Sequence, residues 1–136
     1  MAPVEITPMG GGGQPGTPWA RSPREIDETY GVVAVQMEQI AARPQRNIVE
    51  LSPGEHYAIG IRAAALWTKG ELSLAPLTGD DVLADIGAAV KVLAVAEHLM
   101  TAESTPRQVS AMAAGVRAWL LWLVGADDRM VFRALD

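Results

Sequence analysis

Apolar residues recur at alternating intervals of four and three positions along much of the chain, which places them on one face of an α-helix. The spacing is regular over residues 26–40, 82–100 and 109–123. A further stretch, residues 55–69, is apolar or small at most positions. The seam residues are Ile26, Tyr30, Val33, Met37 and Ile40 in the first stretch, Val82, Ile86, Ala89, Leu93, Ala96 and Met100 in the third, and Val109, Met112, Val116, Trp119 and Leu123 in the last. The pattern predicts four helices and no sheet.

Capping signals set the expected ends of these helices. Ser22 and Ser52 are each followed three positions later by a glutamate, which is the capping-box pattern. The expected N-caps are Ser22, Ser52, Thr78 and Ser104 or Thr105, and the expected terminators are Pro44, Gly70 and Gly125. The predicted helices therefore cover about residues 23–43, 53–69, 79–102 and 106–124.

Residues 1–22 differ from the rest of the chain. They contain four prolines and the run Gly10–Gly13, and Glu5 and Arg21 are their only charged side chains. Ordering such a segment costs about 1–2 kcal/mol of backbone entropy per residue, and few of its side chains can be buried. We expect an extended or disordered arm over residues 1–22, with Trp19 docked near the first helix, that acts outside its own bundle. The helical domain then spans residues 23–136, and residues 127–135 are predicted to add a short C-terminal helix.

The connections between the predicted helices are short, and short connections favour antiparallel neighbours. The sequence therefore predicts an all-α fold: a small four-helix, up-and-down bundle with the arm and the C-terminal helix attached. An aromatic content of 5% agrees with a core made by helix packing rather than by sheets.

Two predicted helices are apolar around most of their circumference. The stretch 55–69 carries a single polar stripe, and the six residues 119–124 are all large and apolar, so that in a helix they point in every direction. A regular four-helix bundle has no central helix, so we expect these faces to contact a partner. The candidate interface residues are Trp19, Trp67, Trp119, Leu121, Trp122 and Val124. The alternative is that the linkers, the arm and the terminal segment cover these faces within one chain.

Composition and charge limit the possible partners. The chain has 136 residues, a formal net charge of −5 and no cysteine. The acidic balance argues against broad nucleic-acid binding, and the lack of cysteine excludes disulfides, thiol catalysis and Cys-ligated metals. The most apolar window, residues 109–124, is interrupted by Arg117 and is shorter than the roughly 20 residues of a membrane span. We expect no nucleic-acid partner, no membrane partner and no secretory signal, and hence a cytoplasmic protein or one assembled into a particle there.

Candidate catalytic residues are few. His56 and His98 each follow a glutamate, but adjacent residues on a helix point in different directions, so we interpret both as ordinary surface or helix-end residues.

Four carboxylates invite comparison with a known class of enzyme. The all-α nucleotide pyrophosphohydrolases resemble this chain in size and helix count, and they bind magnesium through two carboxylate pairs at three- or four-residue spacing. The matching residues would be Glu25 with Glu28 and Asp81 with Asp85. Three of these four lie in predicted first turns, where acidic residues are expected because of the helix dipole alone. No cluster of lysine or arginine lies beside them to bind phosphate.

The sequence thus favours a non-enzymatic structural or interaction protein without a cofactor. It is expected to form a homo-oligomer or to dock into a larger assembly, such as a phage or virion particle, through its apolar helix faces and its arm. Two alternatives stay open: a small regulatory binder or inhibitor of a larger protein, and a magnesium-dependent all-α nucleotide pyrophosphohydrolase.

Overall fold

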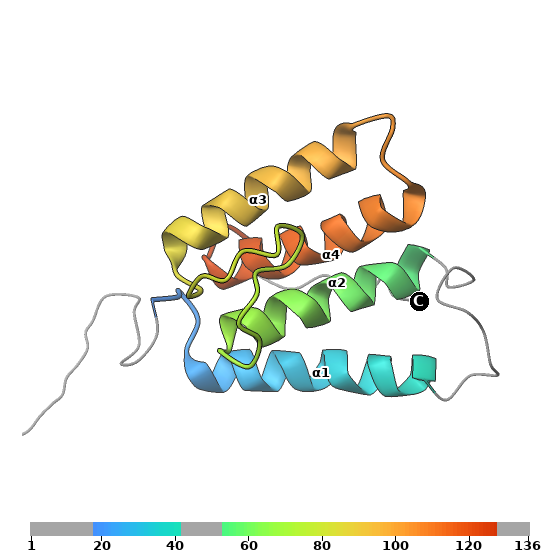
Figure 1. Cartoon of the computed structure of the whole chain (residues 1–136). Coiled ribbons are helices and arrows are strands. Elements are labelled where there is room, and N and C mark those ends of the chain that lie inside the picture. Colours follow the sequence, from blue (N-terminus) through green and yellow to red (C-terminus); the bar gives the residue numbers. More distant parts are fainter. Residues whose placement is uncertain (1–17, 42–52, 128–136) are drawn as a thin grey trace, which may run out of the picture.

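Four α-helices run in alternating directions along the chain (Figure 1). The computed structural model describes residues 18–41 and 53–127. The helices are α1 (Pro23–Ala41), α2 (Pro53–Thr68), α3 (Ile86–Thr101) and α4 (Arg107–Leu123). These two described ranges contain no strand, and their β-structure is limited to one antiparallel bridge between Leu74 and Asp81. The prediction of an all-α fold is confirmed, whereas residues 1–17 of the predicted arm and nearly all of the predicted C-terminal helix lie outside the described residues.

The helices lie in the order α1, α2, α4, α3 across the molecule (Figure 1). α2 packs against α1 and α4, and α4 packs against α2 and α3. α2 and α4 are therefore an inner pair, which is why both are apolar around most of their circumference. The expectation that this bundle has no central helix is wrong, because its two inner helices are each covered on two sides.

Two glycines allow α2 and α4 to cross with their backbones in contact. A Cβ atom added at Gly60 would overlap the carbonyl oxygen of Met112, and one added at Gly115 would overlap that of Tyr57. Each helix thus presents its glycine to a carbonyl group of the other. Small residues at such a crossing let two helices approach more closely than the usual 8–10 Å and bring Cα–H groups against carbonyl oxygens.

The core surrounds this crossing. The largest fully buried side chains are Trp67, Trp119, Ile61, Leu120, Leu123, Val33, Val92 and Val116. Most of them come from α2 and α4, and the outer helices contribute few. From α3, the buried residues are Ala89, Val92 and Ala96, and the half-buried Ala88 and Leu93 pack against the same core.

The predicted start of α1 is confirmed in detail. The backbone N–H of Glu25 donates to Ser22 Oγ at 3.1 Å, and the backbone N–H of Ser22 donates to Glu25 Oε1 at 2.9 Å. The two residues therefore form the reciprocal capping box, which satisfies two backbone donors at the helix start. After α2 and α4, Gly70 and Gly125 adopt positive φ, which matches their predicted role as terminators.

The predicted start of the third helix is wrong. Thr78 does not cap it; α3 begins eight residues later, and the side chain of Asp85 accepts a hydrogen bond from the backbone N–H of Ala88 at 2.8 Å. The residues on either side of Thr78, Leu77 and Gly79, have positive φ, which a right-handed helix cannot accommodate. The start of α4 also differs slightly, since Pro106 rather than Ser104 or Thr105 occupies the N-cap position.

The glycine crossing predicts that alanine substitutions at two different glycines change the stability of the protein in opposite directions. Gly115→Ala should lower the free energy of unfolding by about 1–3 kcal/mol, because the new methyl group overlaps the α2 backbone. Gly31→Ala is the matched control: it lies on the exposed side of α1, where the new Cβ meets no atom within 4 Å, and it should stabilise the protein by about 0.5–1 kcal/mol. Urea denaturation measures the change in the free energy of unfolding for both variants. A Gly115→Ala variant as stable as the wild type contradicts direct backbone contact between α2 and α4.

The raised pKa of Tyr57, which lies beside the crossing, predicts a loss of stability at alkaline pH. Burial raises the pKa of its hydroxyl above the ordinary 10.0, and the negative charge of Asp127 adds to the effect. Because the folded state then holds the proton more tightly than the unfolded state, the stabilisation is complete below pH 10 and is lost as the pH rises through the folded-state pKa. We expect the free energy of unfolding to fall as the pH rises above 10. Tyr57→Phe should make that decline shallower, and an unchanged slope in urea titrations would refute the assignment.

Candidate interaction surface

The four tryptophans predicted to form an interface lie inside the chain. Trp19, Trp67, Trp119 and Trp122 have at most 5% of their surface exposed. Leu121 and Val124 are half-buried. The apolar surface of these tryptophans is therefore covered within one chain, as in the alternative interpretation, and a subunit contact through the six predicted residues stays a prediction that a single chain does not test.

Hydrogen bonds and ring contacts fix the tryptophans on α2 and α4. The indole N–H of Trp119 donates to Thr68 Oγ1 at 3.0 Å, and that of Trp67 donates to the carbonyl oxygen of Val82 at 3.1 Å. The rings of Trp119 and Trp122 are 5.1 Å apart and tilted by 52°. A buried indole needs such a partner for its N–H. The Trp67 bond also attaches the connection between α2 and α3 to the core, and the Trp119 bond joins α4 to the end of α2.

The end of the predicted arm is attached to the bundle. The backbone N–H of Ala20 donates to the carbonyl oxygen of Leu123, and Arg21 Nε donates to that of Trp122 at 2.8 Å. The Arg21 guanidinium also lies 4.9 Å from the centre of the Trp122 ring. Trp19 packs within the same core, as the sequence predicted for this one residue of the arm. Residues 18–22 therefore close the end of α4 and belong structurally with the helices.

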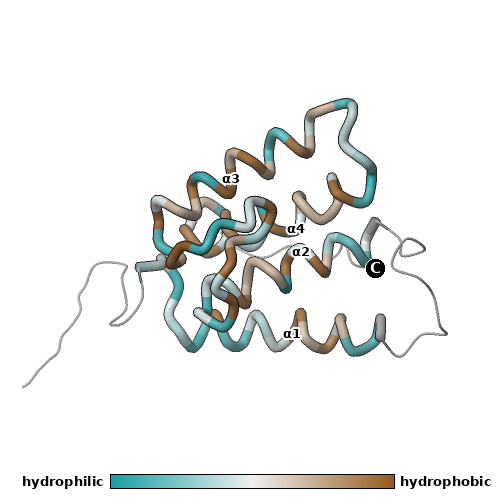
Figure 2. The backbone as a smooth tube through the Cα atoms, in the orientation of Figure 1, coloured by the Kyte–Doolittle hydropathy of each residue, from teal (hydrophilic) through white to brown (hydrophobic). Residues whose placement is uncertain are grey.

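Large apolar side chains are exposed elsewhere, mainly on α3 and the connection that precedes it. The exposed residues are Leu72, Leu74, Val82, Leu83, Ile86, Val90 and Met100 in this part of the chain, and Val32 and Val35 on α1. Figure 2 shows hydrophobic residues on both sides of the α3 coil, including the side away from α4. Leu83 is 83% exposed and Val90 is 57% exposed.

α3 carries two apolar faces. The inner one, formed by Ala89, Val92 and Ala96, contacts α4. The outer one, which we name the α3 seam, consists of Ile86, Val90, Leu93 and Met100 on the helix, together with Leu83 in the connection that precedes it. Leu93 is half-buried and also packs against the core, and the other four are exposed. The predicted seam over residues 82–100 contains residues of both kinds: Ala89 and Ala96 are buried, whereas Val82, Ile86 and Met100 are exposed.

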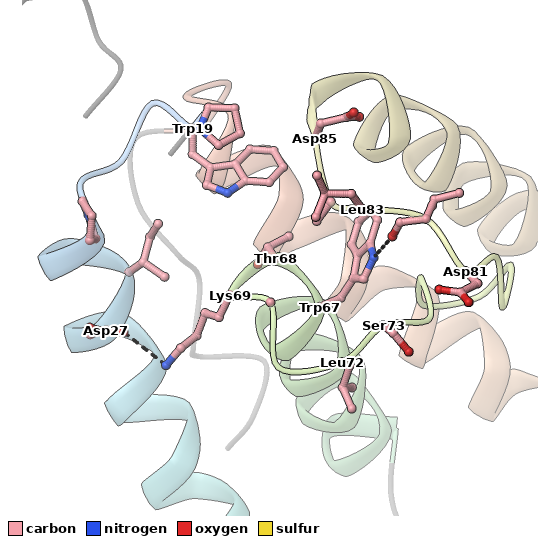
Figure 3. A pocket seen from close by; sticks show the side chains of 16 residues that line it. Trp19, Asp27, Trp67, Thr68, Lys69, Leu72, Ser73, Asp81, Leu83 and Asp85 are labelled. Carbon is pink, nitrogen blue, oxygen red and sulfur yellow. Dashed lines mark hydrogen bonds and ion pairs between the residues drawn. The ribbon is translucent and has the colours of Figure 1, made fainter. Parts of the chain in front are cut away.

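A cavity of about 640 Å³ lies at the end of the bundle where residues 18–27, the end of α2 and the connection 67–85 meet (Figure 3). Trp19, Trp67 and Leu83 form much of its apolar lining. At its edge, Lys69 Nζ lies 3.1 Å from Asp27 Oδ1 (Figure 3). Its polar lining side chains come from Asp27, Thr68, Lys69, Ser73, Asp81 and Asp85, and the remaining lining is largely apolar.

The four candidate metal ligands occupy other roles. Glu25 closes the capping box of α1, Glu28 pairs with Arg24 at 3.0 Å, and Asp85 caps α3. Asp81 is exposed beside the cavity in Figure 3. Across residues 18–41 and 53–127, no three carboxylates or histidines come together in a group that could hold a metal ion.

The two histidines differ in environment. His98 is exposed on α3, as predicted. His56 lies in the first turn of α2, so it is near a helix end, but it is buried rather than on the surface, and its Nε2 has no hydrogen-bond partner.

Comparisons with known proteins give no relative from which the role of this surface could be inferred, so it is interpreted from its own residues. The chain matches no family model, no curated protein and no solved structure. Among the described helices, none combines the length and the apolar character needed to cross a bilayer.

Truncating Trp19 tests whether residues 18–22 belong to the folded unit. Trp19→Ala should lower the free energy of unfolding by about 3–5 kcal/mol, because it empties a core position near α4. Leu83→Ala is the control: Leu83 lines the same cavity but is exposed, and its loss should change stability by less than about 0.5 kcal/mol. The melting temperatures of the two variants, compared with that of the wild type, test whether residues 18–22 belong to the folded unit. Equal melting temperatures for Trp19→Ala and the wild type would show that this segment is not part of the core.

Proposed function

We propose that this protein is a non-enzymatic interaction protein that self-associates, and that the α3 seam with its preceding connection is the surface it uses. The observation that carries the proposal is the exposure of large apolar side chains on a helix that is already packed on its other face. Contiguous exposed apolar residues on a folded chain mark sites of protein contact, whereas scattered single residues do not.

The distribution of exposed residues supports this choice of surface. Among the residues that the structure describes, seven of the nine large exposed apolar residues lie between positions 72 and 100, and the remaining two lie on α1. Within the described ranges, three of the four candidate carboxylates, Glu25, Glu28 and Asp85, serve as caps or ion-pair partners, which does not favour a catalytic interpretation. The net charge of −5 favours protein partners over nucleic acid, because nucleic-acid binding depends on basic side chains that contact phosphates.

Molecular mass in solution tests the proposal. Light scattering over a concentration series should show a mass above 14.4 kDa for the wild type. Val90→Glu should weaken association at least about tenfold, because it places a charge in the proposed contact. Val35→Glu is the matched control: Val35 is 53% exposed on α1, close to the 57% of Val90, and its substitution should leave association unchanged. A wild-type mass of 14.4 kDa at every concentration contradicts the proposal.

A further inference from the structure

We infer that the cavity at the end of the bundle binds a small organic molecule with an apolar body and one protonated amine, and that Asp81 pairs with this amine. The inference goes beyond the proposed function and does not depend on self-association. The cavity volume of about 640 Å³ lies within the range of about 300–1,000 Å³ that is usual for small-molecule sites. Its lining comes from the segment before α1, the start of α1, the end of α2 and the connection to α3 (Figure 3).

The apolar part of the lining determines the body of the ligand. Trp19 and Trp67 line the cavity and belong to the buried core. Leu72 and Val82 also line it, and each is 43% exposed. A ligand that covers Leu72 and Val82 removes apolar surface from water, which favours binding of a hydrocarbon or aromatic group.

The charged side chains of the lining leave one carboxylate without a partner. The side chain of Lys69 is only 18% exposed, and its Nζ lies 3.1 Å from Asp27 Oδ1. Asp85 serves as the N-cap of α3. Asp81 is exposed, and its side chain forms no hydrogen bond or ion pair with any residue that the structure describes. A cation is therefore the charged group that this lining can still bind.

Hydrogen-bond donors of the lining are already in use. The indole N–H of Trp67 donates to the carbonyl oxygen of Val82, and the hydroxyl of Thr68 donates to that of Ala64 at 2.9 Å. A ligand carboxylate would find few side-chain donors here and would lie near Asp81, which is repulsive. An amine brings its own donors and can form a charge-assisted hydrogen bond with the Asp81 carboxylate.

The helix ends around the cavity favour the same sign of charge. α2 ends here, at the lining residue Thr68, and the C-terminal end of a helix carries partial negative charge (Figure 1). α1 and α3 begin on this side, and a helix start carries partial positive charge. Each of these two starts already has an acidic cap of its own, Glu25 in α1 and Asp85 before α3. The helix ends therefore give an anion little additional stabilisation.

Three matched probes test the chemistry of the ligand. Phenethylamine, phenethyl alcohol and phenylacetate share an aromatic body and differ in a cationic, neutral or anionic end. In a nuclear magnetic resonance titration, the amine should shift the indole N–H signal of Trp67 and the methyl signals of Leu72, with a Kd of about 0.1–1 mM for a ligand of this size. The alcohol should bind about two- to fivefold more weakly, because an exposed ion pair adds modestly to affinity, and phenylacetate should bind more weakly still. The methyl signals of the buried Val116 should not shift.

Two adjacent carboxylates separate a specific contact from a general effect of charge. Asp81→Asn should weaken binding of phenethylamine about two- to fivefold, to the affinity of the alcohol, and should leave binding of the alcohol unchanged. Asp80→Asn is the matched control, because Asp80 is exposed and is next to Asp81 in the sequence but does not line this cavity. It changes the net charge by the same amount and should bind the amine as the wild type does.

Three results would overturn the inference. They are equal affinity for phenylacetate and phenethylamine, equal weakening of amine binding by Asp80→Asn and Asp81→Asn, and no shift at Trp67 or Leu72 with up to about 10 mM amine. Light scattering on the same samples separates this inference from the proposed function. Amine binding by a wild type that stays monomeric would support the inference while contradicting the proposed self-association.

Discussion

The contact between the α2 and α4 backbones at Gly60 and Gly115 is the constraint on which the rest of the structure depends. It places these two helices together at the centre, although they are not consecutive in the chain. α1 and α3 must then lie on the outside, each with one main helical neighbour. Because the inner helices are covered on two sides, they carry most of the large apolar side chains without exposing them.

The same constraint separates the buried tryptophans from the exposed apolar surface. Trp119 and Trp67 are held between the inner helices and the connection, with their N–H groups bonded to Thr68 and Val82. α3 packs on α4 through Ala89, Val92 and Ala96, whereas Ile86, Val90 and Met100 on the same helix are exposed. α3 thus contributes one face to the core and leaves other large apolar side chains at the surface. This distinction underlies the proposed function.

Local signals in the sequence predicted the local structure well. The capping box at Ser22 and Glu25, the four helices and the terminating glycines all follow from short-range chemistry, and the structure contains them. The start of α3 could not be predicted in the same way, since Thr78 followed by acidic residues is a normal capping pattern. A bridge between Leu74 and Asp81 and positive φ at Leu77 form a turn there instead.

The identity of the inner helices depends on long-range packing, which the sequence pattern does not specify. Ala111 and Gly115 lie four residues apart in α4, a spacing that lets a neighbouring helix approach closely but does not specify which helix. Without the pairing of Gly115 with the backbone of Tyr57, an apolar helix could equally be a core helix or an interface. The hydrophobic excess of Trp119–Val124 suggested an outward face, but Trp119 and Trp122 are buried within the chain, whereas large apolar residues of α3 and of the connection before it are exposed.

Nuclear magnetic resonance of methyl groups with a soluble paramagnetic agent tests most directly that the outer face of α3, rather than the inner helices, is the association surface. In dilute solution, the methyl signals of Leu83, Ile86 and Val90 should broaden strongly, and those of Val116 and Leu120 should not. As the protein concentration rises, the α3 signals should become protected, while Val35 on α1 stays accessible. If Val90 remains fully accessible at concentrations where the protein is oligomeric, the α3 seam is not the contact and the account is wrong.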